Sequence, residues 1–66
     1  MDIEKNFTYH APKEDQVNRY QCIRDTGKGF AMLIDSACPD SGEKSLAITK
    51  LEECIMWANA AIARNE

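Results

Sequence analysis

Two groups of side chains in this sequence have the chemistry to hold an anion. In the first group, Arg24 and Lys28 are four residues apart, and Tyr9 stands upstream of them, before a proline. If the segment is helical, this spacing places both cations on one side of it. An aromatic ring beside a guanidinium or ammonium group is suited to a base and its phosphate. The alternative interpretation is a solvated helix face with surface ion pairs to Asp25 or Glu14.

The second group is Lys44, Ser45 and Thr49, near the start of another predicted helix. Free backbone N–H groups and the helix dipole favour an anion at such a position. The alternative is ordinary helix capping without a ligand. Asp40 is a good N-cap residue, and Glu43 stands three residues later in capping-box register.

Catalytic chemistry is not indicated. The segment Asp25-Thr26-Gly27-Lys28-Gly29 lacks the first glycine and the hydroxyl residue of a phosphate loop. The adjacent Glu52 and Glu53 do not face each other on a helix, so we expect them to be solvated, or paired with Lys50 or with a partner chain. No serine, cysteine or histidine constellation for nucleophilic catalysis is present, and the single His10 leaves no zinc site. We therefore expect a protein that is not an enzyme and binds no metal or cofactor.

Two segments show helical spacing of apolar residues. The first runs from about Pro12, suited to the first helical position, to Ala37, and the second runs from about Ser41 to Arg64. Cys38-Pro39-Asp40 separates them. The predicted apolar rows are Tyr20, Ile23, Gly27, Phe30 and Ile34 in the first helix, widened by Val17 and Ala31, and Leu51, Ile55, Ala58 and Ile62 in the second.

These elements predict an all-α single domain over residues 1–66: an N-terminal arm over about 1–11 and an antiparallel two-helix hairpin. Such a short hairpin has little core, so we expect it to assemble into an oligomeric helical bundle. Trp57 faces away from the row of Leu51 and Ile55, where it can cover a subunit interface. Gly27 and Gly29 have two interpretations. They are tolerated weak spots or sites of close helix packing, or else they allow a ligand or a neighbouring subunit to approach closely.

Composition excludes several classes of protein. The net charge of −3 disfavours a general duplex-DNA binder. The odd count of cysteines, without C-x-x-C or a signal peptide, disfavours a secreted disulfide scaffold. We expect Cys22 and Cys54 to be small buried thiols. No apolar run approaches a membrane span, and the cytosol is the expected location.

Several stretches resemble the small phage anti-CBASS proteins that sequester cyclic oligonucleotide signals. The most specific part combines Leu51-Glu52-Glu53 with the tryptophan, asparagine and alanine cluster of Met56–Arg64. The other stretches are Phe7–Pro12, Tyr20–Arg24, Cys38–Ser41 and Lys44–Glu53. Together they cover nearly the whole chain.

The resemblance implies an all-helical homohexamer in the host bacterial cytoplasm. It implies binding of 3′,3′-cGAMP-like cyclic dinucleotides, and of cyclic tri-adenylate-like trinucleotides at separate sites, without cleavage, so that the CBASS effector is not activated. For the dinucleotide site, it implies Tyr9 together with either Arg24 or Lys28, supplied by two protomers.

For the trinucleotide site, the resemblance implies Lys44, Ser45 and Thr49, with Thr8 and His10 contributed by the arm. Lys44 stands where the family pattern has arginine, and lysine does not reproduce a bidentate arginine contact. Two competing hypotheses are a helical protein–protein interaction adaptor with no nucleotide ligand, and an enzyme that cleaves the signal. The second lacks a catalytic constellation.

Overall fold

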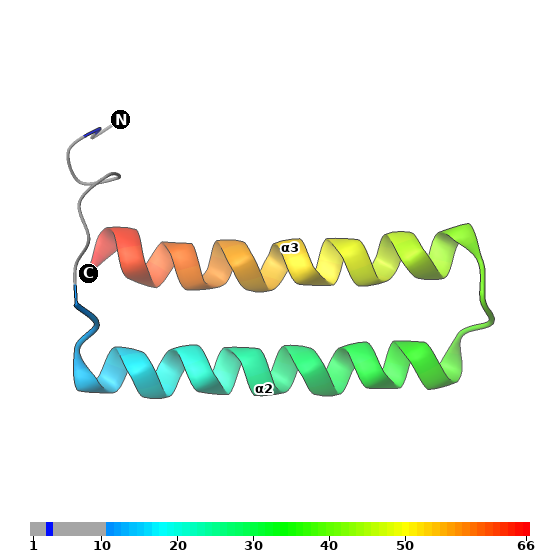
Figure 1. The fold of residues 1–66 in the computed structure, drawn as a ribbon, viewed down its shortest axis with the longest axis horizontal. Helices are drawn as coiled ribbons and strands as arrows, with labels where there is room; N and C mark the ends of the chain where they lie inside the picture. Colours follow the sequence, from blue (N-terminus) through cyan, green and yellow to red (C-terminus); the bar gives the residue numbers. More distant parts are fainter. Residues whose placement is uncertain (1–2, 4–10) are drawn as a thin grey trace.

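The computed structural model describes Ile3 and residues 11–66, which form two helices and no strand. Helix α2 spans Glu14–Ala37 and helix α3 spans Gly42–Asn65. The helices lie side by side in opposite directions, joined by one short turn (Figure 1). This arrangement confirms the predicted all-α antiparallel hairpin. The arm residues Thr8, Tyr9 and His10 lie outside the described residues.

Helix α2 begins two residues later than predicted. Lys13 is the N-cap, with extended backbone angles (φ −74°, ψ 159°), and its N–H donates to Gln16 Oε1 at 2.9 Å. Pro12 therefore precedes the cap, and its prediction as the first helical residue is wrong. Glu14 and Asp15 occupy the first turn, where their charge complements the helix dipole.

The turn ends α2 and caps α3 through local hydrogen bonds. The Cys38 N–H donates to the Ile34 carbonyl at 3.0 Å, and Pro39 follows. The N-cap of α3 is Ser41, whose Oγ accepts from the Lys44 N–H at 3.1 Å. The prediction of Asp40 as the cap is wrong, because its carboxylate pairs with the Lys44 ammonium instead. Glu43 consequently lies at the second helical position, out of capping-box register.

The two helices meet along partly buried apolar rows. Residues Leu51, Ile55, Ala58 and Ile62 form the predicted row of α3, and Ile48 extends it. In α2 the predicted row is wrong at Val17 and Phe30, which are 48% and 54% exposed, and Ala31 takes the place of Phe30. The helices pack closely at the buried Gly27, where an added Cβ would lie 2.6 Å from Ile55 Cδ1.

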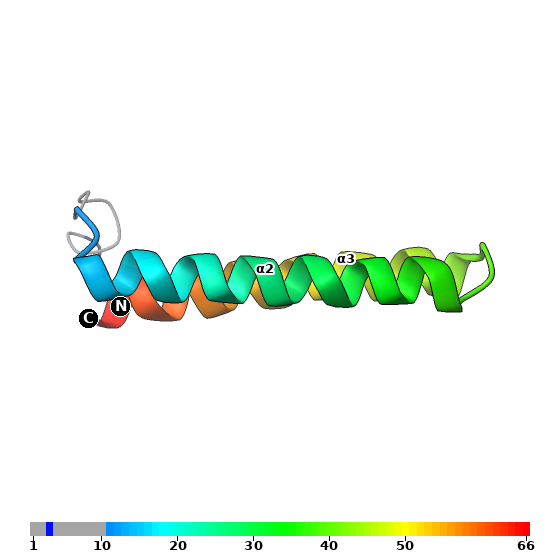
Figure 2. The same cartoon turned by 90° about the horizontal axis from the view of Figure 1, so that it is seen from below.

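The described residues form a single layer, 43 × 25 × 12 Å in extent (Figure 2). None of their apolar side chains is fully buried. Cys22 and Cys54 are exposed, so the prediction of buried thiols is wrong for the single chain, whose one layer has nothing to cover them. Neither α2 nor α3 has a stretch that is long and apolar enough to span a bilayer.

Candidate functional site

Arg24 and Lys28 line the same groove, here called the central groove, which runs between α2 and α3 and has a volume of about 270 Å³. Their common side follows from the helical spacing of four residues. The groove has an apolar floor that both helices supply, formed by Gly27, Ala31, Ile48, Leu51 and Ile55.

The two cations of the central groove are exposed and make no ion pair within residues 11–66. Their exposure agrees with the solvated helix face of the alternative interpretation, but the surface ion pairs that it includes are absent among these residues. Asp25, the adjacent acid, accepts a hydrogen bond from Gln21 Nε2 at 2.9 Å instead. The positive charge of Arg24 and Lys28 remains available to an anionic ligand.

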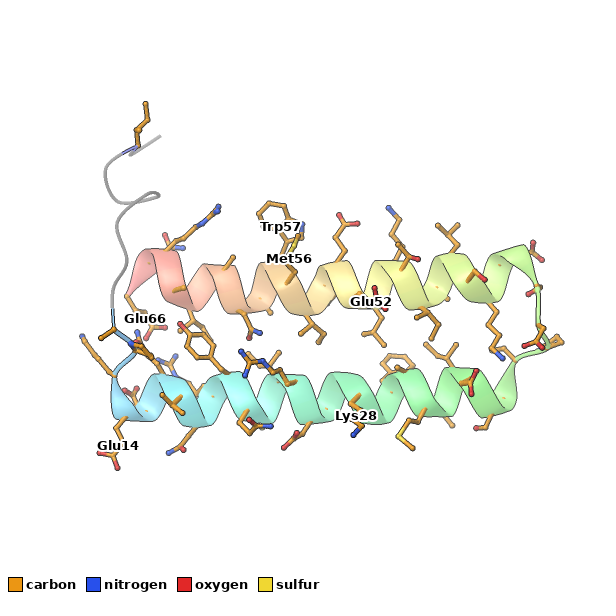
Figure 3. All side chains as sticks on the ribbon, in the orientation of Figure 1. Glu14, Lys28, Glu52, Met56, Trp57 and Glu66 are labelled. Atoms are coloured by element: carbon orange, nitrogen blue, oxygen red, sulfur yellow. The ribbon has the colours of Figure 1, made fainter. Side chains whose placement is uncertain are left out.

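Glu52 is a third charged residue of the central groove, and sequence reasoning missed it there. Figure 3 shows Lys28 and Glu52 at about the same level along the hairpin, on α2 and α3. The Lys50 ammonium pairs with Glu53 at 3.6 Å, whereas Glu52 has no ion pair within residues 11–66. The predicted apolar row did not identify this position, because it did not include Ile48, which lies on the groove floor four residues before Glu52.

The second candidate group lies at the closed end of the hairpin, in a groove of about 400 Å³ beside the turn. We call it the turn groove. Lys44 and Ser45 line it, but the exposed Thr49 does not. The remaining lining residues are Asp35, Asp40, Ser41 and Ile48.

The cation of the turn groove is held by two carboxylates. The Lys44 side chain is 12% exposed, and its ammonium lies 2.9 Å from Asp40 Oδ1 and 3.1 Å from Asp35 Oδ1. Hydrogen bonding to Asp40 and then Asp35 raises the pKa of Lys44, and the same bond to Lys44 lowers the pKa of Asp40. An anion in this groove would meet two carboxylates as well as one cation.

The side chains that line the two grooves can bind a ligand through charge and apolar contact. Among the described residues, no group of three His, Cys, Asp or Glu side chains is placed to hold a metal ion. The described cysteines, Cys22, Cys38 and Cys54, line neither the central groove nor the turn groove. The central groove instead presents cationic, anionic and apolar surface together, as a site for a charged ligand with flat rings would require.

A family model described as Acb2/Tad1, hairpin domain, matches residues 1–63 of this chain of 66 residues. The match covers both grooves and nearly all of both helices. The chain belongs to the Acb2/Tad1 hairpin family. This is the phage anti-CBASS sponge family to which the sequence resemblance pointed. Neither a curated protein nor a solved structure matches the chain.

Membership of the Acb2/Tad1 hairpin family gives the general class of ligand. The family binds cyclic oligonucleotides, and its members are sponge-type binding proteins rather than enzymes. A cyclic oligonucleotide carries one phosphate per nucleotide beside a flat base. The central groove presents groups for both parts, since guanidinium and ammonium groups suit phosphates and an apolar floor suits bases.

Proposed function

We propose that this protein binds cyclic dinucleotides of the 3′,3′-cGAMP type and sequesters them intact in the cytoplasm of the host bacterium, so that the CBASS effector is not activated. The observation that carries this proposal is the central groove, where Arg24 and Lys28 stand over an apolar floor without an ion pair among the described residues. A cyclic dinucleotide is a dianion with two bases, which complements both features.

The pocket we propose is completed by a second copy of the chain. A cyclic dinucleotide has pseudo-twofold symmetry, which suits a pocket built from two identical subunits. Each subunit would supply Tyr9 to stack on one base and Arg24 or Lys28 to meet one phosphate. Stacking contributes about 1–3 kcal/mol per base. The exposed apolar surface of the single layer supports assembly, and we propose a homohexamer.

A second pocket, for cyclic tri-adenylate-like trinucleotides, is proposed at the turn groove. Lys44 and Ser45 line it, and Thr49, with Thr8 and His10 from the arm, would complete it. Lys44 would have to share its ammonium between the ligand and the carboxylates of Asp35 and Asp40. We therefore expect weaker binding here than in the central groove.

The test is calorimetry of the purified full chain against a panel of cyclic di- and trinucleotides, followed by release of the ligand on heating and determination of its mass. Arg24→Ala and Lys28→Ala are measured separately, and the substitution of the residue that meets the phosphate should weaken dinucleotide binding about 10-fold or more, because a hydrogen bond to a charged group contributes about 1.5–3 kcal/mol. Tyr9→Ala should also weaken it. Lys50→Ala is the matched control, since Lys50 pairs with Glu53 and lines neither groove.

Two outcomes would contradict the proposed function. Linear products that accumulate with time would show an enzyme. If a folded oligomer bound none of the ligands in the panel, a sponge for these ligands would be excluded. The result would favour the protein–protein adaptor, for which the exposed apolar residues would be the binding surface.

A further inference from the structure

We propose that Glu52 contacts the base of the bound ligand and gives the central groove a preference for guanine. This inference rests on the proposed function of the groove as a cyclic dinucleotide site. It adds a residue that determines which base the site selects.

The position of Glu52 is set by the packing of α3 on α2. Ile48 and Ile55, four residues before it and three after it, form part of the groove floor. Glu52 therefore lines the same groove as Arg24 and Lys28. It forms an ion pair with neither cation. The groove thus offers separate positive and negative groups to one ligand.

The charge pattern requires a ligand with two kinds of group. Phosphate oxygens suit Arg24 and Lys28, but they repel the carboxylate of Glu52. A ligand with phosphates alone would be bound more weakly because of Glu52. A ligand that also presents N–H donors to the carboxylate would turn this repulsion into a charge-assisted hydrogen bond.

Guanine presents the donors that a carboxylate requires. An ionised carboxylate is an acceptor with two oxygens, and the Watson–Crick edge of guanine has two adjacent donors, N1–H and the N2 amino group. The same edge of adenine has one donor, the N6 amino group, beside the acceptor N1. One oxygen of Glu52 would face the lone pair of adenine N1. Glu52 should therefore favour guanine over adenine.

Within residues 11–66, a structural role for Glu52 has no support. Its neighbour Glu53 has an ion pair with Lys50, and Glu43 lies in the first turn of α3, where it complements the helix dipole. Glu52 has no ion pair among these residues, and it lies in the middle of α3, away from the N-terminal turn where a carboxylate complements the helix dipole. Within residues 11–66, no ion pair keeps its carboxylate from a ligand in the groove.

The test compares the full chain with Glu52→Gln and Glu53→Gln by calorimetry against cyclic di-GMP and cyclic di-AMP. We expect the unmodified protein to favour cyclic di-GMP by at least roughly 5- to 150-fold, which is the discrimination of one good bidentate base contact, and by more if both subunits of the pocket make it. Glu52→Gln should remove most of this preference, partly by improving the binding of cyclic di-AMP. Glu53→Gln, the matched control on the adjacent residue, should retain it.

The outcomes separate this inference from the proposed function. Equal binding of the two ligands, or an unchanged ratio in Glu52→Gln, would overturn the guanine preference while leaving the sponge intact. If a folded oligomer bound neither ligand, both the guanine preference and the proposed function would be contradicted. Arg24→Ala or Lys28→Ala, whichever removes the phosphate contact, provides a further contrast, since it should weaken both ligands by similar factors and leave their ratio unchanged.

Discussion

Gly27 and Gly29 are two residues apart in α2 and have different surroundings. A Cβ added to Gly27 would lie 2.6 Å from Ile55 Cδ1 and 2.8 Å from Ile55 Cγ1, whereas one added to Gly29 would meet nothing within 4 Å. Gly27 therefore lets α3 approach α2 closely, which forms the floor of the central groove. The interpretation of close helix packing is confirmed for Gly27 only.

Alanine substitutions at these two glycines should change stability in opposite directions. Gly29→Ala should raise the free energy of unfolding by about 1 kcal/mol, because alanine is the better helix former by that amount. Gly27→Ala gains the same stabilisation from helix propensity, but it forces the Ile55 side chain to move. That side chain is β-branched and therefore stiff in a helix. Overpacking typically costs about 1–3 kcal/mol, so Gly27→Ala should be net destabilising.

Thermal unfolding of the two variants at equal protein concentration is the measurement. A melting temperature for Gly27→Ala at or above that of the unmodified chain would show that α3 does not approach α2 this closely. Gly29→Ala serves as the control for helix propensity, because it makes the same chemical change on the same helix.

At the scale of the elements, ion pairs join the two helices at both ends of the hairpin. At the open end the Arg19 guanidinium on α2 bonds Glu66, just after α3, with one contact of 2.8 Å. Figure 3 shows Glu66 beside the start of α2. At the closed end, Lys44 on α3 binds Asp35 of α2 and Asp40 of the turn. Hydrogen bonds to Arg19 and Lys44 lower the pKa of Glu66 and of Asp40.

These pairs make the hairpin sensitive to acid. A carboxyl whose pKa is lower in the folded state stabilises it fully above the unfolded-state pKa, and this stabilisation is lost as the pH falls through the folded-state value. The unfolded-state values are about 4, so stability should decline from about pH 4 downwards. Because Asp40 and Glu66 are exposed, added salt should weaken the effect.

The measurement is the melting temperature between neutral pH and pH 2 for the unmodified chain and for the double variant Asp40→Asn, Glu66→Gln. The double variant should be less stable at neutral pH and should lose less stability on acidification. Glu52→Gln is the control, since Glu52 makes no ion pair within residues 11–66. Parallel acid profiles for all three proteins would contradict the prediction.

At the scale of the whole molecule, the hairpin exposes the kind of residue that a folded protein usually covers. Its apolar side chains are only partly buried between α2 and α3, and several large ones are more than half exposed. These are Phe30, Met32, Leu33, Leu46, Met56 and Trp57 in the two helices. Figure 3 shows Met56 and Trp57 on the side of α3 away from α2, as predicted for Trp57. Such surface favours association with further copies.

Association should make stability depend on protein concentration. We expect the melting temperature of the unmodified chain to rise with concentration, since subunits that bind only the folded state stabilise it by mass action. Trp57→Ala should weaken association by about 30-fold or more, the effect of removing an interface hot spot of about 2 kcal/mol. Sedimentation measures the assembly, and Lys50→Ala on the same helix should leave it unchanged. A monomer at all concentrations would contradict the prediction.

The sequence by itself determined the features that depend on residues close together along the chain. The two helices and the break at Pro39 were predictable within two residues, because apolar periodicity and proline act locally. The common side of Arg24 and Lys28 was predictable for the same reason, since a spacing of four residues places two side chains together on any helix.

Only the tertiary structure decided the features that depend on how α2 and α3 are rotated against each other. That rotation placed Ala31 rather than Phe30 in the interface, set Gly27 against Ile55, and brought Lys44 to Asp35 across the hairpin. It also brought Glu52 into the groove of Arg24 and Lys28. An apolar stripe on a helix is wide enough to allow several rotations, and side-chain packing between the helices selects one of them.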